Sequence, residues 1–86
     1  MNISKQEQRV LHVLAQGGMI RFERGTNGKL TRVHCFTHDG MVLSDCTLDV
    51  VAKLKRKRLI ASRRSMPYRI SAIGRRMVRP QLNNRT

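Results

Sequence analysis

A dense run of basic residues is the strongest chemical signal in this sequence. Residues 53–58 place five cations within six positions, and further arginines follow at residues 63–69. Such side chains bind phosphate or carboxylate groups, and arginine can do so through two parallel hydrogen bonds. The pattern therefore predicts a surface that binds a polyanion or an acidic protein, with these candidate residues: Lys53, Arg56, Lys57, Arg58, Arg63, Arg64 and Arg69.

The charge of the whole chain is unevenly distributed. Residues 1–49 contain six basic and five acidic side chains, whereas residues 50–86 contain twelve basic side chains and no acid, within a net charge of +13. Like charges in a compact chain repel one another, and an anionic partner relieves that repulsion. The alternative is a basic face that only contacts water. A membrane surface is disfavoured, because the basic stretches lack the Trp and Phe of an interfacial helix.

Two histidines and two cysteines form a loose set that could bind a metal. Cys35 and His38 have a usable spacing, and Cys46 could approach them. Alternation along a strand, however, places His34 and Cys35 on opposite faces of a sheet. We therefore expect no metal and no cofactor, but two small buried thiols. A disulfide between the cysteines is conceivable, although a reducing cytoplasm disfavours it.

Catalytic patterns are weak in this sequence. The chain has no glycine-rich phosphate loop, and Asp39, Asp45 and Asp49 do not form a recognisable metal-binding cluster. A metal-independent ribonuclease could use a histidine as its proton carrier, which keeps that activity as a remote alternative. Phe22 and Phe36 are expected in the core, so the pattern does not predict an aromatic platform for single-stranded nucleic acid.

Alternating and helical patterns define the first half of the chain. Ser4 and Glu7 have the spacing of a capping box, and apolar residues at helical spacing predict a helix over residues 5–16 that ends at the following glycines. Alternation then predicts strands at residues 19–24 and 29–37, joined by a turn, and a short third strand at 41–43.

The second half begins with a helix and continues into a small hairpin. Thr47 can cap a helix over residues 48–57. Short strands at 59–61 and 68–70 follow, with Tyr68 as the anchor of this hairpin. A last helix is expected after Ser71, with Ile73 and Met77 facing inward and an end near Arg79, before Pro80. The predicted order is helix, β-hairpin, helix, β-hairpin, helix.

This order predicts a small α+β fold of winged-helix-like type, in which the second hairpin is the wing. We expect one domain over residues 1–86, with a core at about residues 3–82 and a disordered tail at residues 83–86. A hairpin stands where a winged helix normally has its second helix, which weakens the expectation of duplex binding. No apolar run could span a membrane and no signal peptide is evident, so the expected location is the cytoplasm.

Several segments together resemble one known family. The matching segments are residues 2–17, AspCysThrLeuAspVal at 45–50, LysLeuLysArgLysArgLeuIle at 53–60 and ProTyrArgIle at 67–70. In combination they resemble the YjhX family of bacterial toxins over about residues 2–84. The resemblance implies the toxin of a toxin–antitoxin pair, with an acetyltransferase-like antitoxin, that binds DNA topoisomerase I and blocks the relaxation of negative supercoils.

The residues by themselves favour a non-enzymatic protein that acts by stoichiometric binding. The main alternative is a winged-helix transcriptional regulator that places the helix at 48–57 in the major groove of DNA. A ribonuclease toxin is the weaker alternative.

Overall fold

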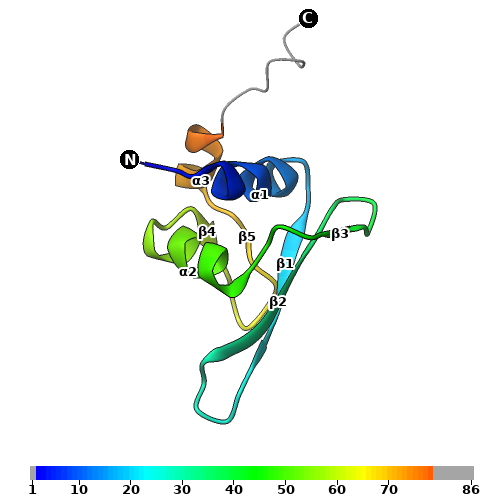
Figure 1. The fold of residues 1–86 in the computed structure, drawn as a ribbon, viewed down its shortest axis with the longest axis vertical. Coiled ribbons are helices and arrows are strands. Elements are labelled where there is room, and N and C mark those ends of the chain that lie inside the picture. The colour runs from blue at the N-terminus through cyan, green and yellow to red at the C-terminus, as the bar shows by residue number, and fades with distance from the viewer. Residues whose placement is uncertain (1, 79–86) are drawn as a thin grey trace, which may run out of the picture.

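The computed structural model describes residues 2–78 as three helices and two small antiparallel sheets (Figure 1). The elements are α1 (Lys5–Ala15), β1 (Met19–Arg24), β2 (Leu30–Phe36), β3 (Val42–Leu43), α2 (Leu48–Arg56), β4 (Ile60–Ala61), β5 (Arg69–Ile70) and α3 (Ala72–Met77). The predicted α+β class and element order are confirmed, whereas the winged-helix likeness stays a prediction. The tail predicted at residues 83–86, the end of the core at residue 82 and the stop at Pro80 lie outside the described residues.

The ends of α1 have the structure that the sequence predicts. The Ser4 hydroxyl accepts the Glu7 N–H at 3.2 Å, and the Glu7 carboxylate accepts the Ser4 N–H at 3.0 Å, which completes the capping box. At the other end Gly17 has φ +101°, a left-handed conformation that costs glycine little. The Gly17 and Gly18 N–H groups donate to the carbonyls of Leu14 and Val13, so the helix ends in a Schellman motif.

The first sheet has the order β1–β2–β3, and its inner face contributes to the core. Ile20 lies opposite Cys35, which in turn lies opposite Leu43. Ile20 and Cys35 are fully buried among the apolar side chains of the helices. Among the helical members of this core cluster are Val10, Leu11, Leu14, Val50, Val51 and Leu54.

The prediction that Phe36 lies in the core is wrong. Side chains on a strand alternate, and its neighbour Cys35 is the residue that faces inward. Phe36 therefore lies on the outer face of the sheet, in register with Met19 and Val42. Phe22 does pack against the core, with its ring centroid 5.0 Å from that of Tyr68.

The wing formed by β4 and β5 is fixed to the first sheet by a connection that the sequence did not reveal. Tyr68 and Ile20 exchange two backbone hydrogen bonds, of 3.0 and 2.8 Å. The Tyr68 side chain is only 4% exposed, which confirms its predicted role as an anchor. The long β1–β2 hairpin and the wing therefore lie side by side (Figure 1).

The last helix is shorter than predicted and has a different inner face. Ser71 caps α3 as expected, because its hydroxyl accepts the Gly74 N–H at 3.0 Å. The helix ends at Met77, and Met77 packs against the core, but Ile73 is 40% exposed. The inward prediction for Ile73 is wrong because Gly74 takes that place, with its Cα against the Leu59 carbonyl. No helix within residues 2–78 is long and apolar enough to cross a membrane.

Replacing Gly74 with alanine is expected to destabilise the fold by about 1–3 kcal/mol. The new methyl group would overlap the Leu59 carbonyl oxygen and lie 2.8 Å from Ile70 Cγ1, and backbone cannot move aside as a flexible side chain can. Urea unfolding followed by circular dichroism measures the change. Arg76→Ala, at an exposed position of the same helix, is the control and should change the free energy of unfolding by less than about 0.5 kcal/mol. Equal stability of both variants would contradict this packing.

Candidate functional site

The seven predicted binding residues, here called the basic edge, come from two neighbouring parts of the chain. One group lies on the last turns of α2 and just after it, and the other lies on the wing. Lys53 and Lys57 are partly buried, and the five arginines are exposed. The members are Lys53, Arg56, Lys57 and Arg58 in the first group and Arg63, Arg64 and Arg69 in the second.

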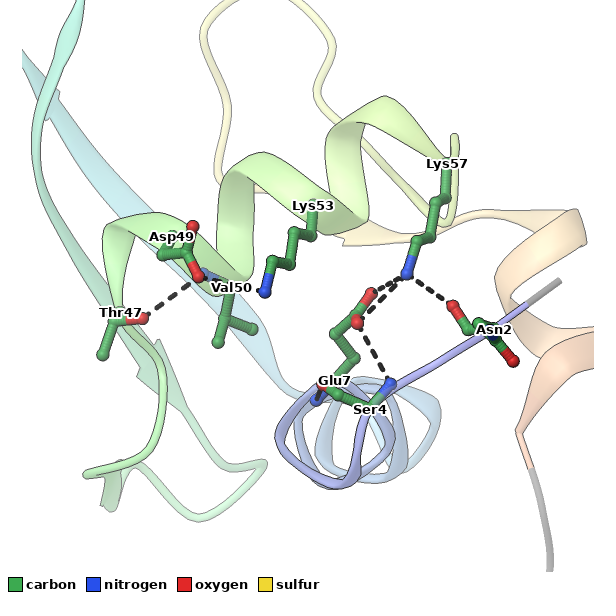
Figure 2. A network of polar contacts seen from close by, with 8 residues as sticks. All are labelled: Asn2, Ser4, Glu7, Thr47, Asp49, Val50, Lys53 and Lys57. Carbon is green, nitrogen blue, oxygen red and sulfur yellow. Dashed lines mark hydrogen bonds and ion pairs between the residues drawn. The ribbon is translucent and has the colours of Figure 1, made fainter.

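Lys57 differs from the other members because it pairs with a buried acid on α1. Its Nζ donates to the two carboxylate oxygens of Glu7 at 2.8 and 3.1 Å and to the Asn2 carbonyl at 2.6 Å (Figure 2). Burial alone would raise the pKa of Glu7, which is 2% exposed, but the hydrogen bonds from Lys57 and Ser4 outweigh it and hold the pKa below its usual value. Lys57 therefore joins α2 to α1 and brings little free charge to the surface.

Lys53 has a weaker pairing on the surface of α2. Its Nζ lies 3.2 Å from the Asp49 carboxylate one turn earlier, and solvent reaches both side chains (Figure 2). An exposed pair of this kind contributes only a few tenths of a kcal/mol. A stronger anion could therefore displace Asp49, so Lys53 remains available to a partner.

The arginines of the basic edge face no acid within the described part of the chain. The ion pairs among residues 2–78 are Arg9–Asp45, Lys53–Asp49 and Lys57–Glu7. Arg69 donates instead to the Gly17 carbonyl at 3.3 Å, and together with Arg63 it lines a shallow groove on the wing. Exposed guanidinium groups without a carboxylate partner are suited to bind phosphate or carboxylate groups of another molecule.

The backbone of Arg58 is the least expected feature of the site. The Arg58 N–H donates to the Lys55 carbonyl at 2.9 Å and the Leu59 N–H to the Leu54 carbonyl at 3.0 Å, so α2 ends in a Schellman motif like that of α1. The left-handed position, held by Gly17 after α1, is held after α2 by Arg58 with φ +61°. A side chain in this conformation costs roughly 1–2 kcal/mol that glycine would avoid.

The tip of the wing repeats this strain. Arg64 and Ser65 have φ values of +52° and +62°, and with Arg58 they are the non-glycine residues of the described chain in the left-handed region. All three lie in or directly beside the basic edge. Strained backbone of this kind tends to occur at functional sites. No sequence signal marks it, because arginine and serine are not residues that predict a positive φ.

The cysteines and histidines do not assemble into a site. Both cysteines are buried and free, and the hydrogen bond between their thiols, together with burial, raises the pKa of Cys46 well above its usual value. His34 and His38 are exposed instead. Within residues 2–78 no three His, Cys, Asp or Glu side chains lie close enough to hold a metal ion.

The Glu7–Lys57 pair makes stability depend on pH in a defined direction. Because folding lowers the pKa of Glu7, the contribution of its carboxylate to stability is complete above about pH 4.5, the unfolded value, and is lost as the pH falls through the folded pKa. Glu7→Gln keeps the helix cap but removes the charge, and it should cost about 1–3 kcal/mol at neutral pH. Urea unfolding at about pH 7 and about pH 3 measures this, and the difference from the native protein should shrink at the lower pH.

Lys57→Met provides the complementary measurement, because it leaves the buried Glu7 carboxylate without its cation. It should destabilise the protein at neutral pH by at least as much as Glu7→Gln. A Glu7→Gln variant with native stability at both pH values would contradict the pairing.

Comparison with known proteins places the chain in one family. A family model described as "Putative toxin of bacterial toxin-antitoxin pair" matches residues 1–85. Similar proteins include UPF0386 proteins of Beijerinckia indica, with 66% identity over 85 residues, and of Ruegeria sp. (strain TM1040), with 62% identity; each match covers 99% of this chain and 100% of the relative. A UPF0386 protein of Aliivibrio fischeri is 54% identical with the same coverage. No solved structure matches. The chain therefore belongs to the YjhX toxin family of bacterial toxin–antitoxin pairs.

Proposed function

We propose that this toxin acts by binding DNA topoisomerase I in a one-to-one complex and so blocks the relaxation of negatively supercoiled DNA. The family supports the toxin part of the proposal, and its description names no enzymatic activity. Topoisomerase I is the target that the resemblance of the sequence to YjhX toxins implies. The acid-free second half of the chain supports binding to an anionic surface, such as DNA held by the enzyme.

The mechanism relies on the arginines of the basic edge. Four of them are exposed and form no ion pair with a carboxylate among residues 2–78: Arg56 and Arg58 at the end of α2, and Arg63 and Arg64 on the wing. Their guanidinium groups would bind phosphates of the DNA that the topoisomerase handles, or acidic side chains of the enzyme itself. Bound in this way, the toxin would obstruct strand entry or strand passage without any chemical step. An acetyltransferase-like antitoxin would cover the same arginines.

The observation that carries this proposal is the left-handed Arg58. The same motif at the end of α1 has glycine, so the fold itself does not require a side chain at this position. Arginine here lowers the stability of the free protein and adds an exposed cation at the end of a basic helix. Arg58 lowers the stability of the fold and forms no ion pair among residues 2–78. Contact with a partner best explains why arginine stands at this position.

Charge reversal of Arg56 and Arg58 to Glu should abolish inhibition without unfolding the protein. Lys57 is left unchanged, because its reversal would set a second acid beside the buried Glu7. The assay follows plasmid relaxation by purified topoisomerase I over a range of toxin concentrations. The native toxin should stop relaxation near equimolar ratio to the enzyme, even with plasmid in large excess. The double variant should need at least about thirtyfold more protein.

The matched control reverses Lys5 and Lys29, two exposed lysines outside the basic edge, and changes the net charge by the same amount. It should inhibit nearly as well as the native toxin. Equal activity of both double variants would overturn the assignment of the surface. A toxin concentration for inhibition that rises with the plasmid concentration rather than with the enzyme concentration would indicate general DNA binding. A strong sequence preference in DNA binding would favour a regulator. RNA fragments formed over many turnovers would favour a ribonuclease.

Arg58→Gly separates the two contributions of this residue. It should raise the free energy of unfolding by up to about 1 kcal/mol, because glycine accepts the left-handed conformation but loses more backbone entropy on folding than arginine does. The same variant should weaken inhibition about tenfold, the effect of losing one charged hydrogen-bond donor. Arg58→Lys retains a cation at the same backbone position and serves as the control. A glycine variant that is more stable and fully inhibitory would show that Arg58 does not contact the partner.

A further inference from the structure

We propose that the outer face of the β1–β2 hairpin binds single-stranded nucleic acid, with an unpaired base stacked on Phe36 and His34 and the phosphates bound by neighbouring arginines. This surface belongs to β1 and β2, whereas Arg56 and Arg58 lie at the end of α2 and just after it. The proposal concerns nucleic acid alone and does not depend on any protein target.

The first argument is the arrangement of aromatic and cationic groups on the outer face. Phe36 lies opposite Met19, and His34 lies opposite Arg21. The rings of His34 and Phe36 have centroids 6.4 Å apart, and the Arg21 guanidinium lies 6.0 Å from the Phe36 centroid. His34 and Arg21 are exposed, and Phe36 is half-buried. Rings and guanidinium planes on an open sheet face are the groups on which unpaired bases stack.

The second argument is the concavity between this face and the tip of the wing. The loop between β4 and β5 lies beside the hairpin (Figure 1), and Ser65 and Pro67 from that loop line the concavity together with His34 and Phe36 from the sheet. The space measures about 450 Å³, within the range of small-molecule sites, and could hold a base with its sugar. A flat sheet would offer stacking only, whereas this wall can also select for an unpaired base.

The third argument is the charge around the concavity. Arg21 lines it, and Arg64 directly precedes Ser65, which also lines it. Neither Arg21 nor Arg64 has a carboxylate partner among residues 2–78. Glu23 is the acid that lines the space, and Arg32 lies across from it on β2. A phosphate would therefore be held on the Arg21 and wing side, and the Glu23 carboxylate could accept a hydrogen bond from a base amino group.

These features favour single-stranded nucleic acid over a duplex or a protein. The bases of a duplex are stacked on one another, so their faces cannot reach Phe36 or His34. A protein that docked here would need apolar area, but the concavity is lined largely by charged and polar groups. Stacking also explains why the outer face exposes rings that the core does not use.

The test measures binding of a fluorescently labelled thymidine oligonucleotide of about 12 nucleotides by anisotropy, with a duplex of equal length in parallel. Phe36→Leu keeps the apolar volume but removes the ring, and it should weaken single-strand binding about tenfold while duplex binding changes little. Arg21→Gln should weaken single-strand binding as well. Lys5→Gln, an equal charge change on α1, should have less than about a twofold effect.

A second measurement does not depend on any variant. In nuclear magnetic resonance spectra of the native protein, the ring protons of Phe36 and His34 should shift upfield as the oligonucleotide is added, because a stacked base shields them. Shifts confined to α2 and unchanged rings would overturn the proposal. Equal losses for single strand and duplex in Phe36→Leu, or no oligonucleotide binding at all, would overturn it too. Because these experiments contain no topoisomerase, their failure would leave the proposed inhibition untouched.

Discussion

The small number of acids constrains this structure more than any other feature. The chain has five acidic side chains against eighteen basic ones, so most cations cannot pair with an acid. Three of the acids form ion pairs with basic residues among residues 2–78. Glu7 neutralises Lys57 where α1 meets α2, Asp45 pairs with Arg9, and Asp49 pairs with Lys53. The positions of these acids therefore decide which cations hold the fold together and which have no carboxylate partner in the part of the chain that the structure describes. The arginines after α2 and on the wing belong to the second group.

The two Schellman motifs differ in the residue at their left-handed position. After α1 the left-handed position is glycine and the helix ends at little cost, whereas after α2 it is arginine in the same conformation. The residues that end α1, Gln16, Gly17 and Gly18, have no charged side chain. The end of α2 continues into the wing, where Arg64 and Ser65 are also left-handed. Within the described residues, the non-glycine positive φ values therefore occur only in the segment whose arginines form no ion pair there, which fits a surface shaped for a partner.

Much of the fold follows from local patterns. The capping box of Ser4 and Glu7, the caps at Thr47 and Ser71 and the alternation in β1 and β2 predict the elements closely, because each depends on neighbouring residues. The errors arise where distant parts meet. Phe36 faces outward because Cys35 occupies the core, and Ile73 is exposed because Gly74 must approach Leu59. The pairing of Tyr68 with Ile20 joins residues that no local pattern connects.

The candidate site shows the same limit. The sequence located the basic edge but treated its seven members as equivalent, since composition contains no information about partners. Only the three-dimensional arrangement separates Lys57, which is bound to Glu7, from Arg56 and Arg58, which form no ion pair among residues 2–78. The salt dependence of binding to the complex of topoisomerase I and DNA tests the central claim most directly. The affinity should fall steeply between about 50 and 300 mM salt, with a log–log slope near −5 for about six phosphate contacts. An affinity that does not change with salt would contradict a toxin that acts through unpaired cations.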